Sequence, residues 1–495
     1  MTADKPAGSG PGAGAGAAPP AIRLTAGWVA EAMGGDLVSG DRRRELAGVS
    51  IDTRTIGAGE LYFAIRGDRF DGTDFAAAAL AAGAGGVVVP SGRGRDVIRE
   101  GAAGPDDRSG APLVIEVAET TSALQALAHT VRRASGTTVV AITGSAGKTT
   151  TKEVTAEFLE TRYRVIRNRG NFNNHIGLPL SLIDLRQRPE IAVVELGMNH
   201  AGEISTLVRI AEPDVRVWTN VGDAHLEFFG SLDDTADAKA EILEGAADSA
   251  LLVANADDDR IMARAPAFAG RLVTFGIERP AAVRASAIVD RGVAGTSARI
   301  TTPRGAFDLT TPLVGPGNLA NVLAATAVAA ELDVPLEAIA ERAQRLGPAA
   351  RRGEIVRLSD GVTIIDDSYN ANPTATRQAL HVLAHERTAV RRVAVLGEML
   401  ELGDRATALH EAVGRAAAAL RIDLLVTVGG GPAAALAAAA IAAGVAAGSV
   451  RHFATSDEAA AAVVDLVRAG DLLLVKGSRG VRTDRVVERL KAERA

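Results

Sequence analysis

The chain contains no cysteine among its 495 residues. This absence excludes disulfide bonds, thiolate metal sites and a cysteine nucleophile. A chain without cysteine suits a reducing compartment, and we expect a cytoplasmic location.

Long apolar runs are also missing. The segment PAAALAAAAIAAGVAAG at 432–448 consists mainly of alanine and glycine and is too short to cross a bilayer. It predicts a helix that ends in a glycine-rich turn. Residues 1–20 are rich in glycine, proline and alanine without the apolar core of a secretion signal, so they predict a disordered tail. We therefore expect no membrane insertion.

Basic charge is not in excess anywhere in the chain. The net charge is −6, and no block of lysine and arginine interrupts the sequence. Binding to nucleic acid or to an anionic membrane surface normally requires such a block, so we expect neither. A hydrophobic fraction of 47% with 23% charged residues describes a globular protein.

The length predicts about three domains. Short apolar runs alternate with alanine-rich helical segments, which predicts an α/β fold with parallel, doubly wound sheets. A stretch of stronger β character lies at 295–314. The pattern divides the chain into blocks at 21–135, 136–348 and 349–495.

A glycine-rich loop follows the apolar run TTVVAI at 137–142. The sequence TGSAGKTTTK at 143–152 lacks the first glycine of the general phosphate-loop pattern, because Ile142 stands in its place. A strand, a glycine-rich turn and a helix that begins at Lys-Thr nevertheless form the context of a phosphate site. Lys148 would supply positive charge and Thr149 a hydroxyl for Mg²⁺. The predicted nucleotide loop comprises Gly144, Ser145, Ala146, Gly147, Lys148, Thr149 and Thr150.

Two further polar residues follow apolar strands. Glu195 lies at the carboxyl end of the apolar strand in EIAVVEL, at the edge of the sheet where α/β proteins bind ligands, and we expect it to hold Mg²⁺. His225 comes after the run VRVWTN, and Lys239 lies fourteen residues further on. A single histidine in a loop is weak support for a metal site on its own.

Taken together, these motifs resemble the Mur ligase family, the ATP-dependent enzymes that add amino acids to the peptidoglycan precursor. TGSAGKTT matches the nucleotide loop TG[ST]xGKT[TS] of this family, which explains the missing glycine. The resemblance extends over nearly the whole chain, through SIDTRTIGAGELYFAIRGDRFDGTDF, NRGNFNNHIGLPLSL, DDSYNANP, LGEMLELG and LVKGSRG.

The resemblance implies a three-domain architecture with a central P-loop ATPase-like parallel sheet and a C-terminal Rossmann-like domain. DDSYNANP and GEMLELG are typical of the member that joins UDP-N-acetylmuramoyl-tripeptide to D-alanyl-D-alanine through an acyl phosphate. ATP and Mg²⁺ are the implied cofactors, with Lys239 carbamoylated by CO₂, and a monomer is expected. The alternatives are another Mur-type ligase, such as a folylpolyglutamate synthase, and a non-catalytic nucleotide-binding homologue. The third residue of the tripeptide, diaminopimelate or lysine, stays open.

The resemblance also implies the site residues. The catalytic set is Lys148, His225, Lys239 and Arg352, with Arg351 as the alternative to Arg352. The metal ligands are Thr149, Glu195, His225 and carbamoylated Lys239. The nucleotide contacts beyond the loop are Asn318, Asn321, Tyr369 and Asp367, with Asp366 as the alternative to Asp367. The uridine-nucleotide pocket contains Thr53, Arg54, Asp71 and Asp74. Further substrate contacts are Asn171, Asn174, Asn370, Asn372, Lys476 and Ser478.

One position departs from the family pattern. The adenine-side motif GxHNxxNxxAA reads GPGNLANVLAA here, so Gly317 replaces the histidine. Asn318 and Asn321 are three residues apart at a helix start and therefore lie on one face. We expect the missing imidazole to weaken nucleotide binding modestly.

Overall fold

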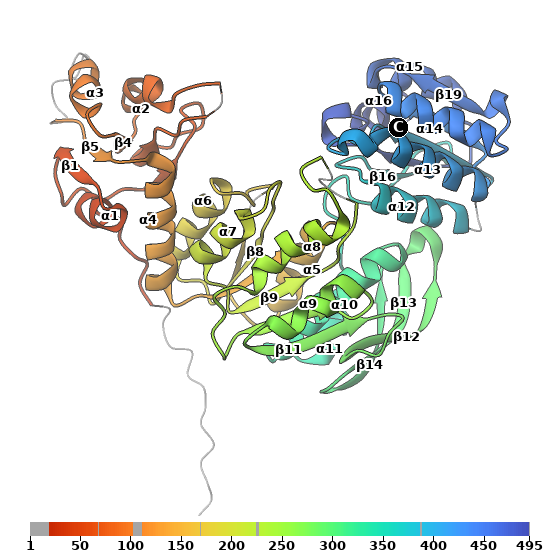
Figure 1. Cartoon of the computed structure of the whole chain (residues 1–495), viewed down its shortest axis with the longest axis horizontal. Helices are drawn as coiled ribbons and strands as arrows, with labels where there is room; N and C mark the ends of the chain where they lie inside the picture. The colour runs from red at the N-terminus through yellow and green to blue at the C-terminus, as the bar shows by residue number, and fades with distance from the viewer. Residues whose placement is uncertain are drawn as a thin grey trace, which may run out of the picture.

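The computed structural model describes residues 19–67, 69–101, 111–168, 170–223, 227–386 and 389–494. The predicted ligand His225 lies outside this part of the chain, as does the predicted tail except for its last two residues. The described residues form three β-sheets, and Figure 1 shows each sheet in its own lobe.

The N-terminal lobe contains a mainly parallel sheet. Its strands are β1 Asp36–Ser39, β2 Gly48–Ser50, β3 Glu60–Phe63, β4 Gly86–Pro90 and β5 Val114–Val117, in the order β1-β5-β4-β3-β2. Its helices are α1 Ala26–Met33, α2 Ala76–Ala81, α3 Gly94–Gly101 and α4 Thr120–Ser135. Strand β1 runs antiparallel to β5, whereas the other neighbours pair in parallel. Helices α1 and α4 cover one face of the sheet, and α2 and α3 cover the other.

The middle lobe contains the longest sheet. Its strands are β6 Thr138–Thr143, β7 Val165–Arg167, β8 Ile191–Glu195, β9 Val215–Trp218, β10 Leu251–Asn255, β11 Arg271–Gly276, β12 Val283–Asp290, β13 Thr296–Thr302 and β14 Gly305–Thr311. The order is β14-β13-β12-β11-β10-β9-β6-β8-β7, parallel from β7 to β12 and antiparallel beyond. The predicted β-rich stretch is thus the hairpin at one end of this sheet.

Strand β6 explains why the middle lobe is layered. Its side chains alternate between two cores, with Val139 and Ala141 in one and Val140 and Ile142 in the other. A run buried on both faces is typical of a parallel strand covered by helices on each side. The helices on the second face are α5 Lys148–Leu159, α10 Gly315–Glu331 and α11 Leu336–Ala343. Those on the first face are α6 Gly177–Ile183, α7 Glu203–Ala211, α8 Leu232–Ala240 and α9 Asp259–Arg264.

Helix α4 joins the first two lobes. It begins after Glu119, whose side chain accepts hydrogen bonds from two backbone N–H groups, and it ends at Gly136 with a φ of 68°. Its buried leucines Leu124 and Leu127 belong to a single core that also contains Leu61 of β3 and Leu178 of α6. The core therefore runs without interruption from the N-terminal lobe into the middle lobe.

The C-terminal lobe is a second doubly wound unit. Its strands are β15 Glu354–Arg357, β16 Thr363–Asp367, β17 Arg391–Gly397, β18 Leu424–Val428, β19 Val450–Phe453 and β20 Asp471–Lys476, in the order β15-β16-β20-β17-β18-β19. Helices α12 Pro373–His385, α13 Ala406–Ala419 and α14 Gly431–Ala442 cover one face, and α15 Ser456–Leu466 and α16 Asp484–Arg494 cover the other. The helix predicted within 432–448 is α14.

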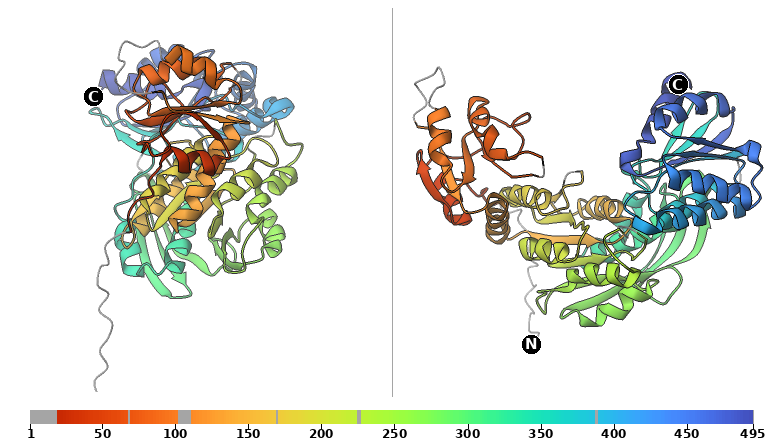
Figure 2. Two further views of the ribbon diagram at one scale, coloured as in Figure 1. Left: turned by 90° about the vertical axis from the view of Figure 1, so that its left-hand side faces the viewer. Right: turned by 45° about the horizontal axis from the view of Figure 1, so that its top comes forward.

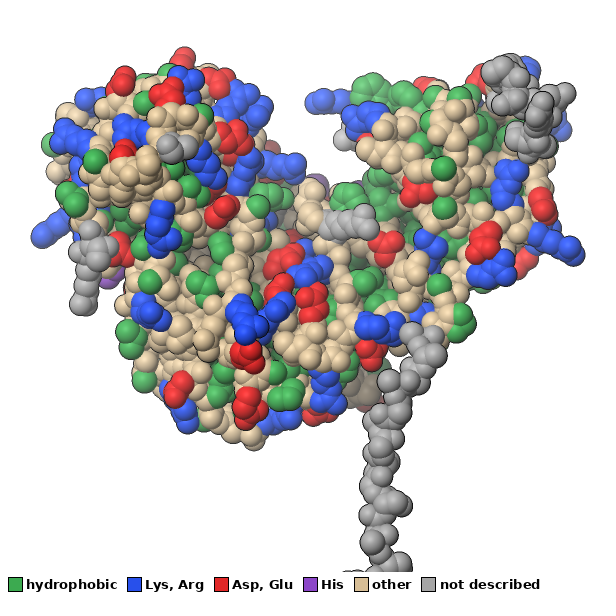
Figure 3. Space-filling model, turned by 180° about the vertical axis from the view of Figure 1, so that it is seen from behind, with side chains coloured by type: hydrophobic (Ala, Val, Ile, Leu, Met, Phe, Trp, Pro, Cys, Tyr) green, Lys and Arg blue, Asp and Glu red, His purple; other side chains and the backbone are tan. Residues whose placement is uncertain are grey.

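The N-terminal and C-terminal lobes stand on the same side of the middle lobe. Figures 1 and 2 show this arrangement from three directions, and the space-filling view of Figure 3 shows an open hollow between the two outer lobes. None of the described helices combines the length and apolarity needed to cross a membrane. The predicted α/β class with parallel, doubly wound sheets is confirmed.

Candidate active site

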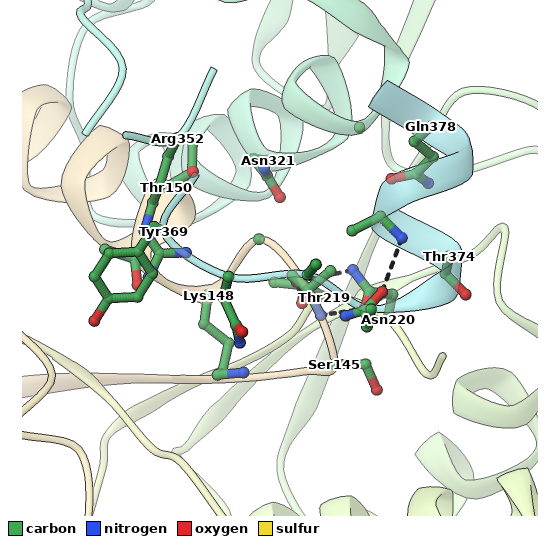
Figure 4. Close-up of a pocket in the computed structure, with 18 of the residues that line it drawn as sticks. Ser145, Lys148, Thr150, Thr219, Asn220, Asn321, Arg352, Tyr369, Thr374 and Gln378 are labelled. Carbon is green, nitrogen blue, oxygen red and sulfur yellow. Dashed lines mark hydrogen bonds between the residues drawn. The ribbon is translucent and has the colours of Figure 1, made fainter. Parts of the chain in front are cut away.

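A cavity of about 860 Å³ lies where the middle and C-terminal lobes meet. The loop before α5, the end of β8 and the start of α10 line it from the middle lobe. Residues after β16, on α12 and after β20 line it from the C-terminal lobe. Figure 4 shows Lys148 near Arg352 and Tyr369, with Thr374 and Gln378 of α12 on the opposite side.

The predicted phosphate loop connects β6 to α5 at the switch point of the middle sheet. Strand β6 lies between β8 and β9, so the chain crosses from one side of β6 to the other, and ligands bind at such points. Gly147 has a φ of 78°, and a Cβ added there would lie 2.2 Å from Asn321 Oδ1. A Cβ added to Gly144 would lie 2.0 Å from Thr219 Oγ1. Both glycines are therefore required by close packing.

We expect Gly147→Ala to lower kcat/KM for ATP at least tenfold, because alanine is strained at this φ by about 1–2 kcal/mol and its methyl group would displace Asn321. Gly317→Ala is the matched control in the same cavity. Its added Cβ would meet only the flexible end of Gln378, at 3.2 Å, and we expect near wild-type values. Steady-state kinetics with varied ATP measure both. Equal effects of the two substitutions would contradict the role given to Gly147.

The loop is held by the residues that follow β9, which sequence reasoning missed. Asn220 Oδ1 accepts a hydrogen bond from the Ala146 N–H at 2.8 Å, and its Nδ2 donates to the Ala146 carbonyl at 2.9 Å. Thr219 Oγ1 donates to the same carbonyl, and Ser145 Oγ exchanges hydrogen bonds with Gly222. Asn220 ends the run VRVWTN, so its position after a strand was the available signal.

Lys148 is half-buried at the first position of α5. Its Nζ donates a hydrogen bond to the Gly144 carbonyl oxygen at 2.7 Å. Burial lowers the pKa of Lys148; the Glu195 carboxylate opposes this shift, and the Arg352 guanidinium adds to it. Because Arg352 belongs to the C-terminal lobe, the two lobes contribute positive charge to the same part of the cavity.

Glu195 ends β8 beside the loop, as predicted from its place in the sequence. Its Oε2 accepts a 2.6 Å hydrogen bond from Thr149 Oγ1, and its Oε1 accepts one of 2.8 Å from Asn173 Nδ2. Asn168 Oδ1 accepts from the Glu195 backbone N–H at 3.0 Å. Asn173 and Asn168 were not predicted. Glu195 is only 4% exposed, and no lysine or arginine of the described residues forms an ion pair with it.

This carboxylate and hydroxyl have the chemistry of a Mg²⁺ site. Hard cations bind oxygen ligands, and the described hydrogen-bond partners of this buried carboxylate, Thr149 and Asn173, carry no charge. No cluster of three His, Cys, Asp or Glu side chains occurs within the described ranges. His225 lies outside those ranges, so its place relative to Thr149 and Glu195 is not described.

Lys239 lies in the last turn of α8 and is 1% exposed. Burial, and then the positive charge of Lys148, lower its pKa well below the ordinary value. No hydrogen bond or ion pair joins its side chain to another residue that the structure describes. Lys152, the other deeply buried lysine of this lobe, differs because its Nζ donates to the Asn168 carbonyl and pairs with Glu153.

The two candidate arginines before β15 have different surroundings. Arg351 forms ion pairs with Asp484 at 2.9 Å and with Glu488 at 2.7 Å, away from the cavity. Arg352 lines the cavity, and its guanidinium carbon lies 4.0 Å from the centre of the Tyr369 ring. The geometry therefore favours Arg352 over Arg351 as the catalytic candidate.

The two aspartates at the end of β16 also differ in their surroundings. Asp366 is buried and accepts hydrogen bonds from Ser368, and burial raises the pKa of its carboxyl group. Asp367 lines the cavity, where its Oδ2 accepts a 2.6 Å bond from Lys476 Nζ. Asp367 is thus the better nucleotide candidate. Lys476 is 4% exposed and already paired.

Several predicted substrate contacts have structural bonds of their own. Asn372 caps α12 by accepting from the Ala375 N–H, and Asn174 accepts from the Gly177 N–H at the start of α6. Ser478 Oγ accepts from the Leu400 N–H and donates to the Ala371 carbonyl. All three also line the cavity, as do the exposed Asn171 and Asn370.

The adenine-side asparagines lie at the start of α10 and line the cavity. Asn318 Nδ2 donates to the Val314 carbonyl, and Asn321 Oδ1 accepts from Thr151 Oγ1 at 3.2 Å. Gln378 of α12 faces Gly317, the position of the missing histidine, at 3.2 Å from an added Cβ. Gln378 was not predicted from the sequence.

The four predicted uridine-pocket residues lie in the N-terminal lobe, outside this cavity. Thr53 and Arg54 follow β2, and a side-chain hydrogen bond from Arg54 lowers the pKa of Asp52 to about 2. Asp71 caps a short 3₁₀ helix through the Thr73 N–H, and Asp74 is exposed within that helix. The structure brings Arg54 and Asp71 to the same lobe but not to the phosphate loop.

Three family models together match most of the chain. Residues 142–329 match the Mur ligase middle domain, and residues 351–479 match the model described as "Mur ligase, glutamate ligase domain". Residues 45–135 match the model described as "Mur ligase family, catalytic domain". The first two matched ranges include residues that line the cavity from the middle lobe and from the C-terminal lobe.

Relatives and solved structures give the same result. The UDP-N-acetylmuramoyl-tripeptide–D-alanyl-D-alanine ligase of Bacillus subtilis is 33% identical, over 95% of this chain and 98% of its own length. The crystal structure of MurF from Acinetobacter baumannii superposes with a TM-score of 0.84 at 30% identity, covering 96% of this chain and 100% of that one. MurF ligase from Thermotoga maritima in complex with ADP has a TM-score of 0.76 at 29% identity, covering 90% of this chain and 97% of that one.

Proposed function

Since this chain belongs to the Mur ligase family, we propose that it is the ATP-dependent ligase that joins UDP-N-acetylmuramoyl-tripeptide to D-alanyl-D-alanine. The observation that carries the proposal is the shared cavity, in which Lys148 of the middle lobe and Arg352 of the C-terminal lobe are within electrostatic reach of each other. The reaction belongs to cytoplasmic peptidoglycan precursor synthesis. The enzyme acts as a monomer whose three blocks serve as uridine-nucleotide, ATP-binding and C-terminal domains.

The chemistry requires activation of a carboxylate. A carboxylate oxygen of the tripeptide attacks the γ-phosphorus of ATP, the bond to the β,γ-bridging oxygen breaks, and ADP leaves. The dipeptide amine then attacks the resulting acyl phosphate, loses a proton, and expels phosphate as the amide forms. Both steps concentrate negative charge on phosphoryl oxygens, so positioned cations lower the barrier. Lys148 and Arg352 are the cations in position to do so.

Mg²⁺ fits the donor set beside the loop. Thr149 Oγ1 and the Glu195 carboxylate would hold it, and it would neutralise phosphate charge when bound. The 2.6 Å hydrogen bond between these two groups places both donors at one point of the cavity. Asn173 orients the carboxylate from the other side.

Carbamoylation of Lys239 fits its surroundings. A buried amine whose pKa is lowered loses its proton more readily, and the neutral amine can add to CO₂ to form an N–C bond with release of one proton. The product is an anion, which the positive charge of Lys148 would attract, whereas that charge repels the unmodified ammonium. Its oxygens would be further ligands for a hard cation.

The test of the proposed function is phosphate release with each substrate omitted in turn. We expect sustained release only when ATP, Mg²⁺, UDP-N-acetylmuramoyl-tripeptide and D-alanyl-D-alanine are all present. Tripeptides that end in diaminopimelate and in lysine are compared in parallel, which determines the third residue. Release with a single amino acid in place of the dipeptide would indicate another Mur-type ligase. No release in any mixture would indicate a non-catalytic homologue.

A further inference from the structure

Two guanidinium groups in the cavity approach the same aromatic ring. The guanidinium carbon of Arg352 lies 4.0 Å from the centre of the Tyr369 ring, and that of Arg479 lies 6.0 Å from it. Arg479 begins a short 3₁₀ helix, Arg479–Val481, which is separated from the end of β20 by two residues, and its side chain is exposed. Within the described part of the chain, neither arginine side chain forms an ion pair or a hydrogen bond.

The remaining cations of the cavity have partners. Lys476 pairs with Asp367 at 2.6 Å and also donates to the Asn370 carbonyl, so its charge is already balanced. Lys148 belongs to the phosphate loop. Arg352 is close enough to Lys148 to affect its pKa, which places Arg352 on the phosphate side of the cavity. Arg479 is therefore a cation without an assigned task.

The reaction brings one more anion into this cavity. The acceptor D-alanyl-D-alanine carries a terminal carboxylate that does not react, and a planar guanidinium can bind a carboxylate through two parallel hydrogen bonds. An acceptor must be held by a group that leaves its amine free to reach the acyl phosphate. The terminal carboxylate is the only charged group of the dipeptide that satisfies this condition.

The two arginines are close enough for one acceptor molecule to reach from one to the other. Because both distances end at the same ring centre, the two guanidinium carbons lie at most 10.0 Å apart, the sum of 4.0 Å and 6.0 Å. An extended dipeptide spans about 7 Å. A dipeptide held at its carboxylate by Arg479 can thus place its amine beside a phosphoryl group held by Arg352.

We propose that Arg479 binds the terminal carboxylate of the acceptor dipeptide and so selects a free C-terminus. The inference rests on the proposed ligase function and adds a specificity residue to it. Both guanidinium groups contact the Tyr369 ring, which fixes the position of the acceptor-binding arginine relative to the phosphate-binding one.

The test compares D-alanyl-D-alanine with D-alanyl-D-alaninamide, which lacks the negative charge. For the wild type we expect the amide to raise the acceptor KM on the order of 10- to 100-fold, the effect of losing a charge-assisted hydrogen bond. Arg479→Ala should raise the KM for the carboxylate substrate by a similar factor and should no longer distinguish the two acceptors. The KM for ATP should stay unchanged, which also reports that the variant is folded.

Arg482→Ala is the matched control, because Arg482 is exposed, three residues away, and outside the cavity lining. It should retain the wild-type preference for the carboxylate, and Arg479→Lys should retain part of it. An Arg479→Ala enzyme that still prefers the carboxylate would overturn the proposal. If Arg479→Ala raised only the KM for the muramoyl substrate, the proposal would also be overturned, because Arg479 would then bind a carboxylate of the tripeptide. If wild type failed to use D-alanyl-D-alanine at all, the proposed function itself would be wrong.

Discussion

Replacing Lys148 with methionine should reduce ligation on the order of 10³-fold while the protein stays folded. Methionine keeps most of the apolar stem of the half-buried side chain and removes its charge. The Glu195 carboxylate and the Arg352 guanidinium both affect the pKa of Lys148. We therefore expect the loss of its charge to matter more than the small change in packing. Phosphate release in the complete substrate mixture measures the effect.

The control for Lys148→Met is its thermal unfolding, compared with wild type. Among the described residues, the Nζ forms one hydrogen bond, to the Gly144 carbonyl, so its loss should cost about 1 kcal/mol of unfolding free energy and leave the transition cooperative. Lys148→Ala should behave in the same way with a slightly larger loss. A folded variant that keeps more than a tenth of the wild-type rate would show that Lys148 does not stabilise the transition state.

Positions at strand ends were predictable because parallel strands bring their carboxyl ends to one edge of the sheet. Glu195 at the end of β8 and the loop after β6 were found in this way, and Thr149 Oγ1 lies 2.6 Å from Glu195 Oε2. The same rule applied to β9 would have found Asn220. It was missed because asparagine after a strand is also ordinary turn chemistry.

Pairwise partners were beyond sequence reasoning. Nothing in the letters DDSYNANP or KGSRG indicates that Asp367 neutralises Lys476, since the two lie on neighbouring strands β16 and β20 whose pairing is set by the fold. The choice between Arg351 and Arg352 likewise needed the surface acids of α16 that bind Arg351. Register within a strand fixes such contacts, and a shift of one residue reverses them.

The link between the first two lobes was also not predicted. A boundary placed after 135 suggests a linker, but α4 buries Leu124 and Leu127 in a core that both lobes share. Periodicity detects that a helix has an apolar face and cannot identify which sheet covers it.

Replacing Lys239 with alanine should leave the enzyme nearly inactive, and added short carboxylic acids should restore part of the activity. The lysine is 1% exposed, its pKa is well below the ordinary value because of burial, and Lys148 adds a repulsive charge. A small acid that enters the space left by alanine would return the negative charge that the proposed carbamate would supply. Phosphate release with and without acetate or formate measures the rescue.

Lys152→Ala is the control for this rescue, because Lys152 is equally buried in the same lobe yet binds the Asn168 carbonyl and Glu153. Its loss leaves those groups without their partner, so we expect lower thermal stability and no response to carboxylic acids.

The proposed carbamate on Lys239 can also be detected directly, without measuring enzyme activity. Wild-type protein equilibrated with ¹³C-bicarbonate should show one carbamate carbon resonance that is absent from Lys239→Ala and present in Lys152→Ala, if the latter is folded. The amine adds to CO₂ only when unprotonated, so the signal should weaken as the pH falls through the lowered pKa of Lys239. Full activity of Lys239→Ala without added acid, or an equal resonance in that variant, would show that Lys239 is a structural lysine whose amine has no part in the reaction.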